Sequence, residues 1–270
     1  MRQGSWEKND ENGGKADGAY RVPGLEKGLN ILSEFSMKEP TLSAPVLSGR
    51  LGIPRTTVFR LLQTLESLGF IERAGNDRNY RLGVAVLRLG FDYLSSLDIT
   101  DLGTPIIEAL RDDIGYTTHM LILDARDVVF IAKAQSNTAQ FSSVKVNIGT
   151  RLPAHATAHG HVLMGDLSLE ELTRLYPERE LRPYTVNTPK TVYELYEVIQ
   201  ADLKRGYGIG RETFEYGISV VTAPVRNQKG KIAAAIATTI PGSRNEGIVL
   251  EERLAQKVKD AAEKLSSYLN

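Results

Sequence analysis

The sequence predicts an α+β protein: an N-terminal winged helix-turn-helix, a linker helix, and a C-terminal domain built on a mostly antiparallel sheet. Three observations support this prediction. Apolar residues recur at helical spacing over residues 24–68, two short strand-like segments follow, and strands alternate with helices from residue 101 onward. We therefore expect two domains with different partners.

The composition is that of an ordinary globular protein. Of the 270 residues, 41% are apolar and 24% are charged, and the 33 basic side chains balance the 33 acidic ones. Cysteine is absent, which excludes disulfide frameworks, thiol catalysis and cysteine-ligated metal centres. The N-terminus lacks a signal peptide's apolar run, and no stretch approaches the roughly 18 apolar residues of a membrane span. We expect a soluble cytoplasmic protein with no membrane partner.

Charge and composition divide the chain into four parts. Residues 1–19 have almost nothing to bury and are expected to form a disordered tail. Residues 20–83 form the expected DNA-binding domain, 84–99 the linker helix and 100–270 the effector-binding domain. Residues 20–90 carry ten basic and six acidic side chains, so the front of the chain is basic and the remainder mildly acidic.

Three helices and a hairpin are expected in the first domain. A helix over 24–37 would place Leu25, Leu29, Leu32 and Phe35 on one face. A short helix through Ser48 and a tight turn over 51–53 precede a third helix, which opens at Pro54 and ends at Gly69. That helix is expected to bury Val58, Leu61, Leu62, Leu65 and Leu68. Strands over 70–73 and 79–82 flank a turn at 75–77.

The later elements follow the same patterns. The linker helix, over 84–97, carries an apolar stripe for a partner helix, formed by Val84, Leu87, Phe91 and Leu94. Helices are expected over 101–113, near 155–165, 168–175 and 191–205, and over 247–269. Strands are expected over 117–123, 128–134, 217–225 and 231–240.

The third helix has the polarity of a DNA-reading helix. Its polar residues lie in the first turn and a half, while its apolar residues face the other way, and a helix of this kind fits the major groove. Basic residues on the wing can reach the DNA backbone or minor groove. The alternative is a helical bundle whose arginines are merely solvated. The candidate DNA-binding residues are Lys27, Arg55, Thr56, Thr57, Phe59, Arg60, Arg73 and Arg78.

Several segments resemble the IclR-type (isocitrate lyase regulator) transcription factors. They are residues 25–32, 51–62, 80–83, 151–158, 217–218 and 223–225, and the resemblance extends over about residues 24–265. It implies a winged-helix domain, a linker helix and a GAF-like effector-binding domain. It also implies homodimers or dimers of dimers that bind double-stranded operator DNA, commonly at small catabolic operons.

The resemblance also places the effector site between residues 155–162 and the last strands. The family's Gly-Lys-Ala run is here Gly160-His161-Val162, its small Gly-Ala pair is Ala158-His159, and an acidic pocket residue is replaced by Gly210. We therefore expect a small organic acid, with room for an aromatic ring, bound with help from Arg211. The alternative is a solvated Arg211 and a pocket that recognises shape alone. The candidate effector-binding residues are Ala158, His159, Gly210, Arg211, Val220, Ala237 and Thr239.

The histidines of the C-terminal domain suggest two other functions. His155, His159 and His161 could make the protein a DNA-binding metal sensor, although Asp166 is the nearest carboxylate, or they could be incidental residues at a capped helix start. His119, His159 and Ser219 could be imagined as a hydrolase set, but no Gly-x-Ser-x-Gly elbow or phosphate-binding glycine motif is present. We expect no enzymatic activity, no catalytic residue, no cofactor and no bound metal.

Overall fold

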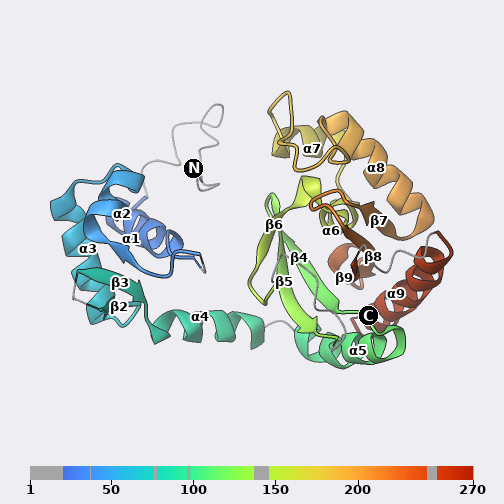
Figure 1. Ribbon diagram of the computed structural model, residues 1–270, viewed down its shortest axis with the longest axis horizontal. Coiled ribbons are helices and arrows are strands. Elements are labelled where there is room, and N and C mark those ends of the chain that lie inside the picture. The colour runs from blue at the N-terminus through green and yellow to red at the C-terminus, as the bar shows by residue number, and fades with distance from the viewer. Residues whose placement is uncertain are drawn as a thin grey trace. The chain divides into compact units, whose positions relative to one another are not determined.

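The computed structural model describes residues 21–36, 38–75, 78–95, 98–136, 146–241 and 248–269. The chain divides into two compact units between Tyr93 and Leu94 (Figure 1). The expected tail over 1–19, the centre of the turn over 75–77 and the last two residues of the expected linker helix lie outside the described residues.

The N-terminal unit contains the expected three helices and hairpin. Its elements are α1 (Pro23–Ser33), β1 (Leu42–Ser43), α2 (Ala44–Leu51), α3 (Arg55–Ser67), β2 (Ile71–Ala74), β3 (Asn79–Leu82) and α4 (Val84–Ser95). The three strands form an antiparallel sheet in the order β1-β3-β2, so the hairpin gains a short third strand that the sequence did not predict. Gly52 ends α2 at φ 63°, a left-handed conformation that glycine adopts without a Cβ clash.

The core of this unit differs in part from the one that the sequence predicted. Val58 and Leu62 of α3 are completely buried, together with Ile31 and Leu47. Leu68, expected in the core, is 59% exposed because α3 ends at Ser67 and turns into β2. Helix α1 also ends early, at Ser33. Its buried residues are Gly28 and Ile31, so Leu25 and Leu29 of the predicted apolar face lie at the surface.

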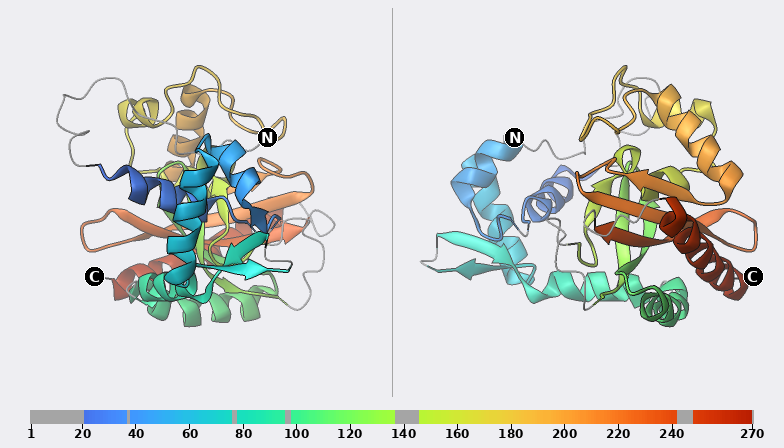
Figure 2. Two further views of the ribbon diagram at one scale, coloured as in Figure 1. Left: turned by 90° about the vertical axis from the view of Figure 1, so that its left-hand side faces the viewer. Right: turned by 45° about the vertical axis from the view of Figure 1, so that its right-hand side comes forward.

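The C-terminal unit is built on one six-stranded antiparallel sheet (Figure 2). The elements in chain order are α5 (Asp98–Ile114), β4 (Thr118–Asp124), β5 (Asp127–Ala134), β6 (Arg151–Pro153), η1 (Ala154–Ala156), α6 (Ala158–Leu163), α7 (Leu169–Leu175), α8 (Val192–Arg205), β7 (Gly208–Arg211), β8 (Ile218–Arg226), β9 (Ile232–Pro241) and α9 (Ile248–Tyr268). The strand order is β6-β5-β4-β9-β8-β7. The edge strands β6 and β7 were not predicted.

The sheet separates two apolar layers. On one face, α5 and α9 cover a core that includes Ile107, Val221 and Val258. On the other face, α6, α7 and α8 cover a core that includes Leu121, Phe130 and Ala237. Side chains alternate between the two faces along a strand. The core that a residue of β8 or β9 joins therefore shows whether its side chain points toward α6 or toward α5 and α9.

Candidate functional site

Helix α3 presents a polar face to solvent. Arg55, Thr56 and Arg60 are exposed, Phe59 is 46% exposed, and Thr57 is half-buried. Val58 and Leu62, on the opposite side, are fully buried and fix the rotation of the helix. The expected separation of the two faces is therefore present. Within the described residues neither Arg55 nor Arg60 forms an ion pair, so both guanidinium groups can reach a phosphate or a guanine edge.

Gln63 extends this face and was not among the residues singled out from the sequence. It is exposed, three residues after Arg60 and seven after Thr56, which places all three on one side of α3. A glutamine amide can bind the edge of adenine with two hydrogen bonds. The helical spacing from Thr56 could have identified it.

The wing arginines differ from each other. Arg73 Nε donates a hydrogen bond to Glu66 Oε1 at 3.1 Å, and its Cζ lies 4.9 Å from the centre of the Tyr80 ring. Arg78 is exposed beside it. An open hollow of about 720 Å³ separates this wing from α3 and is lined by Phe59, Arg73 and Arg78 among others. Lys27 lies on α1 and is half-buried.

The sheet of the C-terminal unit brings most of the predicted effector-binding residues to one face. His119 pairs with Ala237, and Ala237 pairs with Thr222, so the three form a row across β4, β9 and β8. The neighbouring row contains Val220 and Thr239. Gly160 lets α6 approach closely, since a Cβ there would lie 2.1 Å from the backbone oxygen of Ala154.

Two predicted effector residues are placed differently from what the sequence suggested. Gly210 leaves no free room, because an added Cβ would lie 2.9 Å from Ala158 Cβ. Arg211 is exposed and follows Gly210 in β7, so alternation points its side chain to the opposite face of the sheet. Ile209, which shares the face of Arg211, packs against the core under α5 and α9. His159 and Arg211 therefore do not converge on one side of the sheet.

Two imidazoles, one on β4 and one on α6, are buried where α6 packs on the sheet and have no hydrogen-bond partners in the described chain. His119 is 3% exposed and His159 is 4% exposed, and none of their ring nitrogens has a hydrogen-bond partner in the described chain. Both rings meet the ring of Phe130 edge-on, with centroid distances of 5.1 Å for His119 and 5.6 Å for His159. Burial lowers the pKa of each to about 3, so both are neutral at pH 7.

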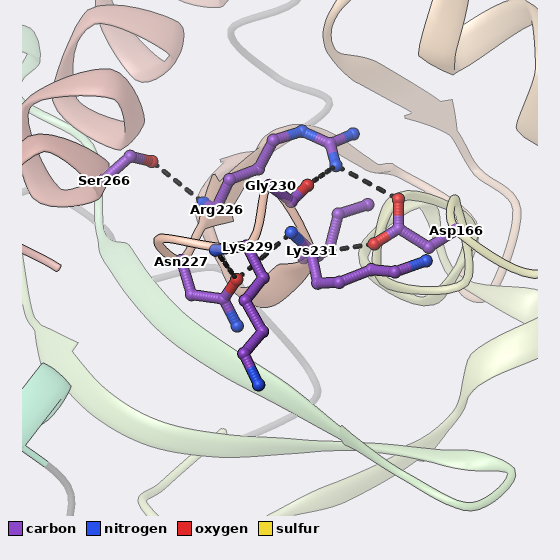
Figure 3. Close-up of polar contacts among 8 residues, drawn as sticks. Asp166, Arg226, Asn227, Lys229, Gly230, Lys231 and Ser266 are labelled. Atoms are coloured by element: carbon purple, nitrogen blue, oxygen red, sulfur yellow. Dashed lines mark hydrogen bonds and ion pairs between the residues drawn. The ribbon is translucent and has the colours of Figure 1, made fainter. Parts of the chain in front are cut away.

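The other two histidines have backbone partners. His155 Nε2 donates to the carbonyl of Arg182 at 2.9 Å, and His161 Nε2 donates to the carbonyl of His155 at 2.9 Å. Among the described residues, no group of three histidine, cysteine, aspartate or glutamate side chains could hold a metal ion. Asp166, the nearest carboxylate in the sequence, instead accepts hydrogen bonds from Arg226 Nη1 at 3.0 Å and from the backbone N–H of Ile232 at 2.7 Å (Figure 3). The alternative of a metal sensor based on His155, His159 and His161 thus receives no support from their placement.

The hydrolase set that the sequence allowed is not assembled. Ser219 shares the face of Val221, which packs under α5 and α9, whereas His119 and His159 lie on the α6 side. A nucleophile and its base must lie within hydrogen-bond reach of each other.

The described residues also contain no helix with the length and apolar character that a membrane crossing requires.

A basic winged helix-turn-helix joined to a sheet domain with unpaired buried polar groups defines a DNA-binding transcriptional regulator. Residues 24–75 match the IclR helix-turn-helix domain, and residues 91–267 match the family described as bacterial transcriptional regulator IclR C-terminal. The chain belongs to the IclR family.

Similar proteins cover nearly all of the chain. The HTH-type transcriptional regulator XynR of Escherichia coli K12 is 32% identical over 226 residues, which are 83% of this chain and 88% of that protein. The p-hydroxybenzoate hydroxylase transcriptional activator of Acinetobacter baylyi is 28% identical over 250 residues, 90% of each chain. A crystal structure of an IclR homologue from Microbacterium hydrocarbonoxydans, complexed with 4-hydroxybenzoate, has a TM-score of 0.77 at 21% identity and covers 91% of this chain and 98% of that one. The last likeness shows the fold alone.

Proposed function

We propose that a small organic acid binds in the C-terminal unit and controls binding of the N-terminal unit to an operator. The observation that carries this proposal is the pair of buried, unpartnered imidazoles of His119 and His159 beneath α6. Buried polar atoms without partners are costly, and a ligand with polar groups would supply the missing hydrogen bonds. We place the effector beside Ala158 and His159, over Val220, Ala237 and Thr239.

Two related proteins support an acid as the ligand class. One relative is named as the p-hydroxybenzoate hydroxylase transcriptional activator, and a protein of the same fold was crystallised with 4-hydroxybenzoate. The side chains of Phe130 and Ala237 form an apolar wall that suits a ring. Aromatic carboxylic acids are therefore the first compounds to test.

We propose that the operator is read by α3 and the wing of a symmetric dimer or dimer of dimers. A single winged helix buries little DNA surface, and specific binding normally needs more. Helix α4 offers an apolar stripe for a partner, since Val84, Leu87 and Phe91 are 78%, 55% and 57% exposed. Leu94, the fourth member of the predicted stripe, has a side chain outside the described set.

In this proposal the protein acts on DNA in the bacterial cytoplasm and has no enzymatic activity. Ligand binding changes the relative free energies of two dimer arrangements and so the spacing of the two recognition helices. Half-sites lie about 34 Å apart or a multiple of that distance, so a small rotation is enough to abolish binding.

The test is a mobility shift with the purified protein and DNA from upstream of its own gene and the neighbouring genes. We expect a salt-sensitive complex on one of these fragments, and we expect an acid from a panel of aromatic and aliphatic carboxylates to change its affinity. Complexes that form equally on every fragment, or that ignore every acid, contradict the proposal. Arg111→Ala, on α5 of the C-terminal unit, serves as a charge control outside the winged helix-turn-helix.

A further inference from the structure

The face of the sheet beneath α6 concentrates unpaired polar atoms. Both ring nitrogens of His119, both ring nitrogens of His159 and the hydroxyl oxygen of Thr222 are buried and lack a hydrogen-bond partner in the described chain. They come from β4, α6 and β8, so three separate elements deliver them to the same layer. Each atom left unpaired costs free energy, because it has lost its hydrogen bonds to water. Packing alone gives no reason for such a cluster.

Only basic groups act on these imidazoles. Burial is the largest cause of the lowered pKa of both histidines. Beyond burial, His159 and Lys133 lower the pKa of His119, and His161 lowers that of His159. Lys133 lies on β5 directly opposite His119, and its Nζ donates to the carbonyl of Val146 at 2.8 Å. No acidic side chain among the described residues contributes to either shift.

The side chains that the neighbouring strands place beside the pair are uncharged. Phe130 of β5 contacts both imidazoles, Ala237 of β9 lies opposite His119, and β8 contributes the neutral Thr222. The ionisable groups that act on the two imidazoles are therefore all bases, which favours an anion over a cation beside them. The buried carboxyl of Asp202 on α8 lies over Gly208 and Thr222 instead, and it contributes to neither pKa shift.

Resting on the proposed acid effector, we infer that its carboxylate binds between His119 and His159 and that this pair takes up one proton from solvent as it binds. A neutral imidazole offers one N–H donor and one lone pair, whereas a carboxylate only accepts hydrogen bonds. When one imidazole nitrogen takes a proton, the pair presents three donors and one positive charge to the carboxylate. The charge of the acid is thereby neutralised inside the apolar layer.

The proton uptake gives the affinity a definite pH dependence. In the free protein the pKa of both histidines lies near 3, and a carboxylate in contact raises the pKa of the nearer one. Between the free and the bound pKa the complex holds one proton more than the separate partners. Affinity therefore rises as pH falls, by about tenfold per pH unit for one full proton.

The sharpest test measures protons directly on the unaltered protein. The full chain is titrated with 4-hydroxybenzoate, and with each acid that shifts its operator complex, by calorimetry at pH 7 in phosphate and in Tris. These buffers differ in ionisation enthalpy, so the difference in observed heat counts the protons taken up. We expect a positive uptake that grows toward one proton as the pH is lowered from 8 to 6, and a Kd that tightens with it, by up to about tenfold per pH unit.

Variants then assign the proton. His119→Gln and His159→Gln keep an amide donor but cannot titrate, and each is expected to weaken acid binding; the variant that removes the proton acceptor abolishes the uptake. His155→Gln is the matched control, because His155 already donates to the carbonyl of Arg182 and should retain the uptake of the parent. Thermal melting shows whether each variant is folded.

The outcomes separate this inference from the proposed function. An acid that binds and shifts the operator complex with no proton uptake in the unaltered protein overturns the inference and leaves the proposed function standing. Uptake that survives in both His119→Gln and His159→Gln also overturns it. If no acid binds and none affects the operator complex, the proposed function fails and the inference fails with it.

Discussion

Arg55 and Arg60 lie on the solvent face of α3 with no ion pair among the described residues, which makes them the residues most available to DNA. We expect Arg55→Ala and Arg60→Ala each to cost about 1–3 kcal/mol of operator binding, or roughly 5- to 150-fold in Kd. An arginine that reads a base relaxes specificity, whereas one that contacts a phosphate weakens all sequences and lowers the salt slope. Fluorescence anisotropy at several salt concentrations distinguishes these cases. Unchanged affinity and salt slope in both variants would show that α3 does not enter the groove.

Arg211 shows why the sequence could predict only part of the geometry of the candidate effector site. The sequence identified Ala158, His159, Val220, Ala237 and Thr239 through a resemblance, but a resemblance does not give the direction of a side chain. Arg211 lies in β7, whose Gly-Ile-Gly-Arg sequence has little strand propensity, so its facing could not be derived from periodicity. The pairing of β7 with β8 determines it. The same holds for His119, whose neighbours Ala237 and Thr222 come from strands about a hundred residues away in the sequence.

At the scale of elements, the packing of α6 depends on the close approach of Gly160 to the backbone of Ala154. A Cβ at Gly160 would lie 2.1 Å from the backbone oxygen of Ala154, and backbone atoms cannot yield as a side-chain tip can. We expect Gly160→Ala to lower the free energy of unfolding by about 1–3 kcal/mol, as for overpacked cores, measured by urea denaturation. Gly49→Ala is the control, since a Cβ there meets nothing within 4 Å and helix propensity favours alanine by about 0.5–1 kcal/mol. Equal stability of the Gly160→Ala variant and the parent would contradict the packing described for α6.

We expect the apolar stripe of α4 to form the contact between two copies of the chain. Leu87 lies on the apolar stripe with Val84 and Phe91, while the equally exposed Leu89 lies on another side of the helix. We expect Leu87→Glu to reduce the oligomer seen by light scattering toward the 29.8 kDa mass of one chain, because the partner stripe would bury a charge. Leu89→Glu should leave the oligomer intact. The opposite result would place the interface on the other side of α4, and a monomeric parent would refute dimerisation.

The long periodic elements could be predicted from the sequence and the short strands could not. Helices such as α3, α8 and α9 have an apolar face at helical spacing, and β8 and β9 are rich in β-branched residues. The strands β1, β6 and β7 have two to four residues each, too few for a periodic signal. They exist because a longer neighbour satisfies their backbone hydrogen bonds. Helix ends also shifted, with α1 ending at Ser33 rather than Met37.

For the whole molecule, buried neutral histidines predict sensitivity to acid. The pKa values of His119 and His159 in the folded state are about 3 and that of His161 about 4, against 6.5 when exposed. Below pH 6.5 the unfolded state binds more protons, so their contribution is present above pH 6.5 and is lost as pH falls toward the folded pKa. Each histidine removes roughly 1 kcal/mol of stability per pH unit in that window.

Asp202 changes the folding stability with pH in the opposite direction to the histidines. Burial raises its pKa to about 6 from 3.8, so its contribution to stability is present below pH 3.8 and is lost as pH rises through 6. One carboxyl cannot offset three histidines, and we expect the free energy of urea unfolding to fall between pH 7 and 5. His159→Gln should flatten this decline, and Asp202→Asn should steepen it. Stability that is constant over this range would mean that the histidines are accessible to protons in the folded state.

The unpaired polar atoms under α6 have a consequence for the cellular lifetime of the protein. Their desolvation without compensation lowers the stability of the unliganded form, and a ligand that satisfies them adds RT ln(1 + [L]/Kd), about 2.7 kcal/mol at a hundredfold excess over Kd. At that concentration the unfolded fraction falls about a hundredfold. Proteases act on that fraction. We therefore expect the regulator to be degraded faster in cells that lack its effector, so the abundance of the protein as well as its affinity for DNA would report the metabolite.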